Sequence, residues 1–191
     1  MERLIRNAVV AYSIRNRRRK AALITDFIER KAIKTAVVIG AVGSASQRNE
    51  SIVEKALEGA DVVAALDIMV AEVPWPYVVG DGRSLPFKDG AVDLLVSNAV
   101  IEHVGQESDQ RRFMDEHVRV GRTWVVTTPN RWFPVEADTS VVFRHWSPKW
   151  RSTRQAEFTR LLSLREFRRL LPRDAVVLGH WWSPTFMAFS G

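Results

Sequence analysis

Apolar runs separated by glycine and proline define the pattern of this chain. From residue 35 onward, short runs of β-branched and aliphatic residues recur, and helical spacing fills several of the intervals. The predicted strands are 35–39, 61–66, 77–79, 91–96 and 122–127. Helical patterns occupy 47–58 and the region around 109–118. Strands alternating with helices predict an α/β fold with a parallel sheet, and continuous apolar strands are typical of a sheet covered on both faces.

The C-terminal part follows a different pattern. Ser163 to Glu166 is a capping-box sequence that should open a helix reaching Leu171. Apolar strands at 175–178 and 186–189 follow, with only a loop between them, which is too short for a parallel crossover. One of these two strands should therefore run antiparallel. Residues 129–160 are a long, aromatic-rich and weakly patterned stretch, which we expect to be a substrate or lid loop.

The N-terminal segment predicts a helical cover over residues 1–34. Residues 3–14 and 21–33 each place apolar side chains on one helical face, and the basic run 15–20 joins or continues these helices. This segment can pack on the sheet as a cover. Alternatively, it is a basic amphipathic segment that rests on an anionic membrane or binds nucleic acid.

Composition narrows the class of protein. The 191 residues fit one domain, and we expect 1–191 to form it. The chain has no cysteine, which excludes disulfides, thiolate zinc sites and a cysteine nucleophile, and no metal is expected. A reducing, cytoplasmic location fits this composition. No apolar stretch approaches the roughly 20 residues of a membrane-spanning helix.

Charge is unevenly distributed along the chain. The formal net charge of +6 divides into +7 for residues 1–35, −7 for 36–143 and +7 for 144–173, and Asp174 completes the balance. An acidic middle with basic flanks fits a cationic ligand at the centre and an anionic partner or surface at the edges. Solvated surface helices would give the same basic flanks.

A glycine turn follows the first predicted strand. Residues 36–46 read as the end of a strand and a turn with Gly40 and Gly43, and a helical pattern follows them. Glycine allows a ligand to approach the backbone closely, and the N-terminus of a following helix attracts anionic groups. The turn lacks the full G-x-G-x-x-G pattern, so on its own it is either a nucleotide site or a tight turn.

Polar residues at the ends of the strands strengthen the nucleotide interpretation. Ligands of open α/β sheets bind outside the carboxyl ends of the strands. Those ends carry the Gly40 turn, Asp67, Asp81 with Gly82, and Asn98. Asp67 lies 24 positions after Gly43, near the spacing at which an acidic residue of the second strand binds ribose hydroxyls. Several ligand-like strand ends in register predict one binding site at this edge.

Residues 80–104 resemble the middle of the class I S-adenosylmethionine-dependent methyltransferases of the type-11-like group. Residues 128–136 and 145–148 resemble a subgroup of those enzymes. The resemblance covers about 20–190 and implies S-adenosyl-L-methionine as cofactor. It also implies a Rossmann-like three-layer sandwich with a seven-stranded, mostly parallel sheet whose last strand is antiparallel. The predicted C-terminal hairpin agrees with that sheet.

The resemblance implies roles for the residues at the strand ends. Asp67 would hold the ribose hydroxyls, Asp81 would accept from the adenine amino group, and Asn98 would line the methionine end. The other implied cofactor contacts are Gly40, Gly43, Ile68, Gly82 and Leu85.

The chain departs from the family pattern at the glycine turn. Val38 stands where an acidic residue usually precedes the first glycine by two positions, and the usual third glycine is absent. The missing acid would have helped to hold the ammonium group of the ligand. A non-catalytic relative that binds S-adenosylmethionine is therefore an alternative.

The reaction implied by the resemblance is an in-line displacement at the methyl carbon of a sulfonium. The protein would mainly supply proximity and alignment, with a base if the acceptor is a hydroxyl. The candidate catalytic residues are His103, Glu136 and His145, and Asp138 is a further candidate base. His103 could instead belong to a Glu102–His103 pair that holds the loop, and Glu136 and His145 could make ordinary loop hydrogen bonds.

The acceptor is expected to be a small molecule, a sugar or a lipid-like compound. A dinucleotide oxidoreductase has less support, because the glycine pattern is incomplete and the sheet ends in a hairpin. A nucleic-acid methyltransferase is an alternative that the basic flanks allow, but no motif for a flipped base is found and nucleic acid is not the expected partner. Peripheral contact with an anionic membrane is a further expectation, and the oligomeric state is left open.

Overall fold

The structure is a computed structural model that describes residues 2–41, 56–135, 142–156 and 159–191. In these residues seven strands form one sheet in the order β3-β2-β1-β4-β5-β7-β6. The strands are β1 Thr35–Ile39, β2 Asp61–Asp67, β3 Tyr77–Val79, β4 Val92–Asn98, β5 Gly121–Pro129, β6 Val176–Leu178 and β7 Thr185–Phe189. Strands β1 to β5 pair in parallel, and β7 is antiparallel to both β5 and β6. The predicted Rossmann-like sheet is thus confirmed.

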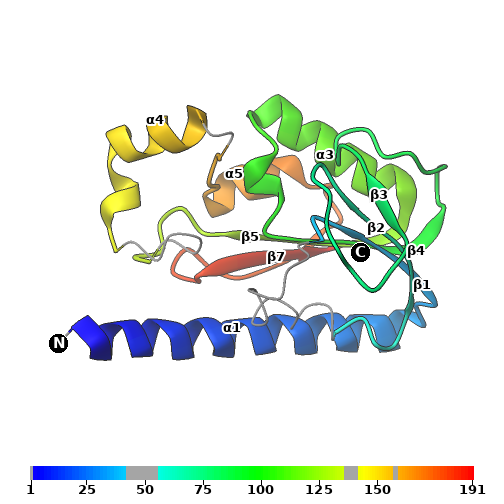
Figure 1. The fold of residues 1–191 in the computed structure, drawn as a ribbon, viewed down its shortest axis with the longest axis horizontal. Helices are drawn as coiled ribbons and strands as arrows, with labels where there is room; N and C mark the ends of the chain where they lie inside the picture. The colour runs from blue at the N-terminus through cyan, green and yellow to red at the C-terminus, as the bar shows by residue number, and fades with distance from the viewer. Residues whose placement is uncertain (1, 42–55, 136–141, 157–158) are drawn as a thin grey trace.

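Helices cover both faces of the sheet, so the fold has three layers (Figure 1). The helix α1 lies along one face, and α3 and α5 lie on the other. The helical elements are α1 Glu2–Lys31, η2 Ile101–His103, α3 Glu107–Val120, η3 Arg144–Trp146, α4 Pro148–Ala156 and α5 Leu164–Leu170. No helix in the described part of the chain is both long and apolar enough to cross a bilayer.

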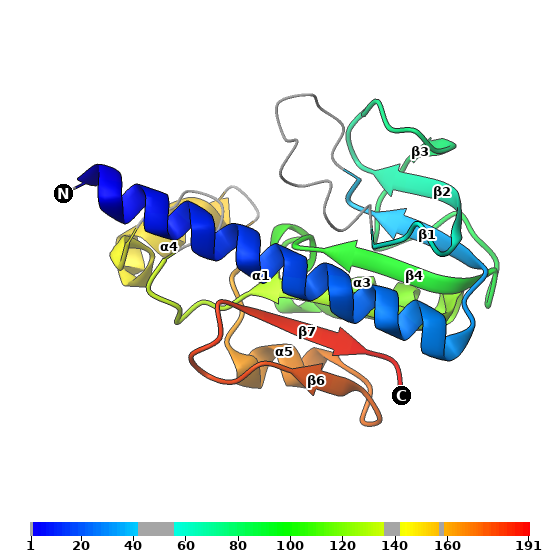
Figure 2. The same cartoon turned by 90° about the horizontal axis from the view of Figure 1, so that it is seen from below.

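The N-terminal cover is one continuous helix. The basic run 15–20 does not interrupt it, because arginine and lysine are good helix formers. Ile24, Phe27 and Ile28 lie on its sheet-facing side and are almost fully buried against Val38 and neighbouring residues. Figure 2 shows α1 running across the sheet and extending beyond the edge at which β1, β2 and β4 end.

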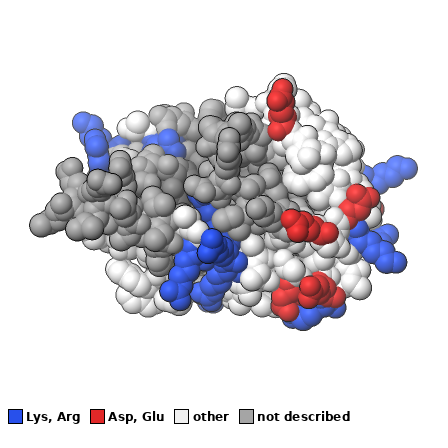
Figure 3. All heavy atoms as spheres, turned by 60° about the horizontal axis from the view of Figure 1, so that its bottom comes forward, with Lys and Arg blue, Asp and Glu red and all other residues white. Residues whose placement is uncertain are grey.

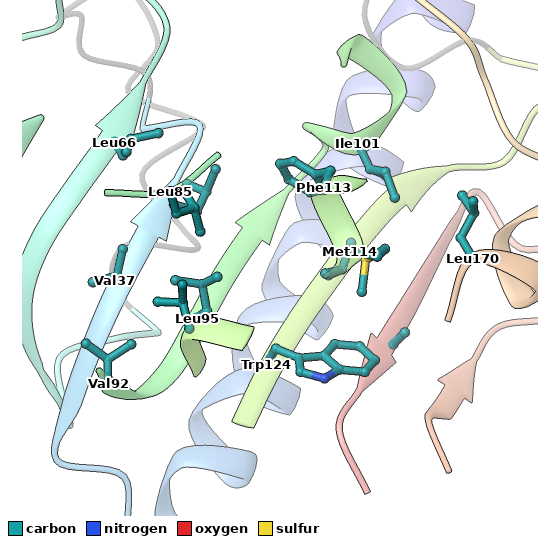
Figure 4. Close-up of a cluster of buried hydrophobic side chains, with 14 of the residues drawn as sticks. Val37, Leu66, Leu85, Val92, Leu95, Ile101, Phe113, Met114, Trp124 and Leu170 are labelled. Carbon is teal, nitrogen blue, oxygen red and sulfur yellow. The ribbon is translucent and has the colours of Figure 1, made fainter. Parts of the chain in front are cut away.

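The sheet is buried on both faces, which explains its continuous apolar strands. Along β4, Leu94 and Val96 belong to the hydrophobic core between the sheet and α1. Leu95 belongs to the core between the sheet and α3. Phe113 and Met114 of α3 pack in this second core, together with Leu95 (Figure 4). Because side chains alternate between the faces of a strand, a strand covered on both sides needs apolar residues at successive positions.

The C-terminal prediction is also confirmed. Ser163 is the N-cap of α5, its hydroxyl accepts from the Glu166 backbone N–H, and the Glu166 carboxylate accepts in return from the Ser163 backbone N–H. The two strands that follow form the hairpin β6–β7. The edge of the parallel sheet is therefore completed by an antiparallel pair.

The long stretch 129–160 contains helical structure that the sequence analysis did not predict. The helix α4 begins at Pro148, and the Ser147 hydroxyl accepts from the Trp150 backbone N–H at 3.2 Å. Serine as N-cap and proline at the first helical position are both helix-start signals that the aromatic composition obscured. Of the predicted helix 47–58, most lies outside the described residues, while Ala56 and Leu57 are buried.

Candidate functional site

The residues predicted to bind the cofactor lie together at one edge of the sheet, as far as the structure describes them. The backbone N–H of Gly40 donates to the carbonyl of Leu66 at 2.7 Å, so the turn after β1 is bonded to the end of β2. The N–H of Gly80 donates to the carbonyl of Asp67 at 2.9 Å, which ties the end of β3 to the same edge. Parallel strands end on one side, so Asp67, Asp81 and Asn98 share this edge.

Gly40 is a position that requires glycine. Its φ of +77° lies in the left-handed region, and a Cβ built on it would lie 2.2 Å from Cγ2 of Val100. Backbone conformation and packing therefore both exclude a side chain here. Val100, which follows β4, packs directly against the turn. Gly43, the second predicted glycine, lies outside the described residues.

Asp67 is half-buried at the end of β2. Its Oδ1 accepts from the Met69 backbone N–H at 3.1 Å, which is the one hydrogen bond of this carboxylate within the described residues. The remaining lone pairs can accept from two neighbouring hydroxyls. Ile68 beside it is 68% exposed, whereas Leu85, the other expected adenine wall, is 5% exposed and belongs to the core.

Asp81 is held by a guanidinium. Arg83 Nε lies 3.0 Å from both carboxylate oxygens, Arg83 Nη2 lies 2.7 Å from Oδ2, and the Arg83 backbone N–H donates to Oδ1 at 2.8 Å. The side-chain hydrogen bond from Arg83 is the main cause that lowers the pKa of Asp81. The carboxylate therefore stays ionised and has a fixed orientation. At Gly82, a Cβ would lie 2.7 Å from the Phe113 ring, so the backbone packs against that ring.

Asn98 is at the end of β4, and its side chain accepts a hydrogen bond from a lysine of α1. Lys20 Nζ donates to Asn98 Oδ1 at 2.8 Å, and Thr127 Oγ1 donates to the same oxygen at 2.7 Å. An amide oxygen has two lone pairs, and both are used here. The NH₂ group of Asn98 is what the side chain can still offer to a ligand.

Lys20 is 6% exposed and was not predicted as a site residue. Burial lowers its pKa to about 8, and the nearby charge of Glu102 opposes that shift. A signal in the sequence could have identified it. Lys20 lies four and seven positions before Ile24 and Phe27, so it shares their sheet-facing stripe, unlike the exposed Arg18 and Arg19 of the same basic run.

The Glu102–His103 pair lies in the short helix η2 after β4. Glu102 is fully buried, and its Oε2 accepts from Thr128 Oγ1 at 3.0 Å. His103 is exposed, and its Nδ1 lies 3.2 Å from Thr159 Oγ1. The pair thus ties η2 to β5 and to the segment before α5. This geometry supports the loop-holding interpretation of Glu102 and leaves the exposed imidazole of His103 at the surface.

His145 is enclosed within the segment that follows β5. It is fully buried, and its Nε2 donates to the Phe133 carbonyl at 2.8 Å. Its ring also makes edge contacts with Trp146 and Trp150, with centroid distances of 5.8 and 6.0 Å. These contacts support a role in holding this segment together. Glu136 and Asp138 lie outside the described residues.

Two cavities lie near the segment that follows β5. One of about 200 Å³ is lined by residues that include Trp150, Arg151 and Thr159. A second of about 580 Å³ lies against α5, with Trp132 and Trp181 in its wall. Among the residues that the structure describes, no group of three or more His, Asp or Glu side chains is arranged to hold a metal ion.

Comparison with known proteins agrees with this geometry. The family model described as "Methyltransferase domain" matches residues 45–123. The matched segment begins two residues after Gly43 and ends at the start of β5, so it includes Asp67, Asp81 and Asn98. Gly40 and Gly43 precede it. Comparison with curated proteins gives no match.

Solved structures share the fold at low sequence identity. The N-methyltransferase NodS from Bradyrhizobium japonicum has a TM-score of 0.57 and 12% identity, over 92% of this chain and 93% of that chain. The YcgJ protein from Bacillus subtilis has a TM-score of 0.56 and 16% identity, over 84% and 69%. A geranyl diphosphate C-methyltransferase from Streptomyces coelicolor, solved with S-adenosyl-L-homocysteine, has a TM-score of 0.53 and 18% identity, over 83% and 62%.

A sheet of this order, with β7 reversed, is the Rossmann-like sheet that these solved methyltransferases share. The match of residues 45–123 to the methyltransferase domain model agrees with this likeness. The chain is therefore similar, in its fold and over this matched segment, to the class I S-adenosylmethionine-dependent methyltransferases. Their cofactor is S-adenosyl-L-methionine.

Proposed function

We propose that this protein transfers a methyl group from S-adenosyl-L-methionine to a small-molecule, sugar or lipid-like acceptor. The observation that carries the proposal is the hydrogen-bonded edge that brings together the Gly40 turn, Asp67, Asp81 and Asn98. Residues 1–191 would act as one domain, with 1–34 as its cover and 129–160 next to the acceptor.

The residues at this edge fit the cofactor in distinct ways. Asp67 makes one hydrogen bond to its own chain in the described residues, which leaves acceptor capacity for the two ribose hydroxyls. Asp81 presents an oriented carboxylate toward which the adenine amino group can donate, with Gly82 and Ile68 beside the ring. Asn98 offers its NH₂ group at the methionine end. Gly40 and Gly43 would pass close to that end.

The bound cofactor supplies an activated methyl group on a sulfonium. The protein has to align the acceptor in line with the carbon–sulfur bond and exclude water. If the acceptor is a hydroxyl, a base assists by removing its proton. His103 is exposed beside the end of β4 and is our first candidate for this role. His145 and Glu136 remain candidates from the sequence, although the burial of His145 favours a positioning role.

Binding and turnover can be tested separately. Thermal-shift and calorimetric titrations with S-adenosylmethionine and with NAD should show binding of the first only. Failure to bind S-adenosylmethionine would contradict the proposal. Incubation with methyl-labelled cofactor and a fractionated metabolite and lipid extract should then label the acceptor. Binding without transfer to any fraction would indicate a non-catalytic relative. The absence of cysteine fits our further proposal of a cytoplasmic location.

A further inference from the structure

Three exposed tryptophans gather at the end of the sheet where the site lies. Trp132 is 43% exposed, Trp181 is 70% exposed and Trp182 is 47% exposed. The rings of Trp181 and Trp182 are 5.2 Å apart, and Trp182 also contacts Phe133 at 6.4 Å between ring centroids. We name Trp132, Trp181 and Trp182 the tryptophan patch. Contiguous exposed apolar surface of this kind marks an interaction site.

The patch is held in place by a buried side chain. Asn130 is 4% exposed, and its Nδ2 donates to the carbonyls of Trp181 and Ser183, at 2.8 Å each. Its Oδ1 accepts from the Trp132 backbone N–H at 2.9 Å. One amide thus joins the two segments that carry the tryptophans. The exposed rings are therefore presented by an ordered framework.

Positive charge borders the patch. The cavity of about 580 Å³ is lined by Trp132 and Trp181 together with Arg165, Arg168 and Arg169 of α5. All three arginines are exposed, and none of them forms an ion pair with an acidic side chain among the residues that the structure describes. A guanidinium of this kind is available for phosphate oxygens.

The patch also lies on the same edge as the proposed cofactor site. The Asn130 backbone N–H donates to the Pro184 carbonyl at 2.9 Å, just beyond the pairing of Pro129 with Thr185. On the face drawn in Figure 3, the acidic side chains lie in the right-hand half, and the left-hand half, toward this edge, carries only Lys and Arg among its described charged residues. The described charged side chains at the end that bears the patch are thus basic on that face.

We propose that the tryptophan patch and the three arginines of α5 dock the protein on an anionic membrane surface. Tryptophan prefers the headgroup region of a bilayer, and basic residues beside it bind anionic lipid phosphates. The rings of Trp181 and Trp182 are tilted by 59° to each other, so they do not form one flat stacking surface. Docking in this way would place the cofactor edge at the membrane, within reach of a lipid-like acceptor.

The inference concerns binding and does not depend on methyl transfer. The full chain is sedimented with vesicles of phosphatidylcholine alone and of phosphatidylcholine mixed with phosphatidylglycerol. We expect binding to the mixed vesicles that weakens as salt is raised. The double variant Trp181→Ala/Trp182→Ala and the triple variant Arg165→Gln/Arg168→Gln/Arg169→Gln should each lose roughly tenfold or more in affinity.

Control variants remove exposed apolar side chains and exposed charges outside the patch. Val118→Ala/Val176→Ala removes exposed apolar side chains, and Arg30→Gln/Arg112→Gln/Arg122→Gln removes three exposed charges outside the patch. Both controls should bind mixed vesicles like the wild type.

A second measurement on the wild type does not rely on substitution. Tryptophan fluorescence should be quenched by brominated lipid in mixed vesicles, and the Trp181→Ala/Trp182→Ala variant should lose most of that quenching. The proposal is overturned if the wild type ignores mixed vesicles, or if the double variant binds them as tightly. It is also overturned if the patch instead binds an oligonucleotide in preference to vesicles. Each result leaves the S-adenosylmethionine titration unaffected, so it is distinguishable from failure of the proposed function.

Discussion

The ammonium group of Lys20 lies 2.8 Å from Oδ1 of Asn98, so the N-terminal helix contributes directly to the edge at which the site is built. Thr127 completes the coordination of this oxygen at 2.7 Å. The two donors fix which way the Asn98 amide faces, because only its oxygen can accept from them. The helical cover therefore orients a predicted cofactor residue as well as burying one face of the sheet.

The first prediction concerns the stability contributed by Lys20. Its pKa is about 8 in the folded protein, below the value of 10.5 for a free side chain. Between these values the unfolded chain binds more protons than the folded one, so the free energy of unfolding rises with pH. Relative to Lys20→Met, the wild type should gain up to about 3 kcal/mol between pH 8 and 10.5. Urea unfolding across this range measures the difference.

Lys31→Met is the matched control for this prediction. Lys31 is exposed near the end of the same helix, and its Nζ donates to the Gly191 carbonyl at 3.2 Å. The pH dependence of this control should follow the wild type. If Lys20→Met also keeps the wild-type dependence above pH 8, the amine is protonated as in the unfolded chain and our account of its burial is wrong.

The second prediction concerns the carboxylates at the ends of β2 and β3. Asp67→Ala and Asp81→Ala should each weaken S-adenosylmethionine binding by roughly 10- to 100-fold, because each removes charge-assisted hydrogen bonds to the ligand. Calorimetric titration measures the affinity. The loss at Asp81 should be accompanied by reduced thermal stability, since Arg83 would lose its main partner.

Asp89→Ala serves as the control for these two variants. Asp89 is an exposed acidic residue that pairs with Arg119, away from the carboxyl ends of the strands, so cofactor affinity should not change. Wild-type affinity in both Asp67→Ala and Asp81→Ala would remove the assignment of the cofactor site to this edge.

Much of the fold follows from the apolar pattern, because a strand buried on both faces has a distinctive sequence. The run around Leu94, Leu95 and Val96 could be assigned to a strand from its length and its β-branched neighbours alone. The same logic located the reversed strand, since the loop between β6 and β7 is too short to cross the sheet. The helix α4 was missed because its Ser147–Pro148 start lay within an aromatic stretch.

The site was less predictable than the fold, because it depends on contacts between residues distant in the sequence. Asp67, Asp81 and Asn98 could be placed at one edge of the sheet because parallel strands end together. Lys20 could not be paired with Asn98 from its position, since 78 residues separate them and only the packing of α1 joins them. Histidine is a residue type that often acts in catalysis, so the sequence made His145 a candidate. Its burial and its hydrogen bond to Phe133 depend on the tertiary structure and could not be read from the sequence.

The third prediction compares two glycines that share a left-handed conformation. Gly40 has φ +77°, and a Cβ added to it would lie 2.2 Å from Cγ2 of Val100. Gly90 has φ +60°, and a Cβ added to it would meet no atom within 4 Å. Gly90→Ala should cost about 1–2 kcal/mol from backbone strain alone. Gly40→Ala should cost about 1–3 kcal/mol more, because the methyl group would clash with Val100. Denaturant unfolding measures both, and equal losses would contradict the contact between Val100 and the turn.

The fourth prediction concerns the segment after β5. Trp132 is exposed and Trp146 is partly buried, and both lie in the expected acceptor region. Replacing either with alanine should leave S-adenosylmethionine affinity unchanged while turnover falls by roughly 10- to 100-fold, because the acceptor is no longer aligned. Calorimetry and a methyl-transfer assay separate these effects. Loss of the folded state, seen by circular dichroism, would show instead that these tryptophans belong to the core.

The last prediction concerns acid stability and His117, a fully buried residue of α3. Its Nδ1 lies 2.8 Å from the Phe113 carbonyl, which can only accept, so Nδ1 carries the proton and Nε2 accepts from Ser97 Oγ at 3.0 Å. Burial, the larger effect, lowers its pKa to about 4 from 6.5. As pH falls from 6.5 to 4 the unfolded chain takes up the proton first, so the folded state should lose up to about 3 kcal/mol.

His117→Gln should remove this acid-sensitive contribution, although it lowers stability at neutral pH by disturbing both hydrogen bonds. The quantity to compare is therefore the change in the free energy of unfolding between pH 7 and pH 4, measured with urea. His180→Gln is the control, because it removes an exposed histidine without touching the core. The control should retain the wild-type loss of stability, while His117→Gln should lose less. An equal loss in both variants would mean that other groups cause the acid sensitivity, and that His117 can accept a proton without unfolding the protein.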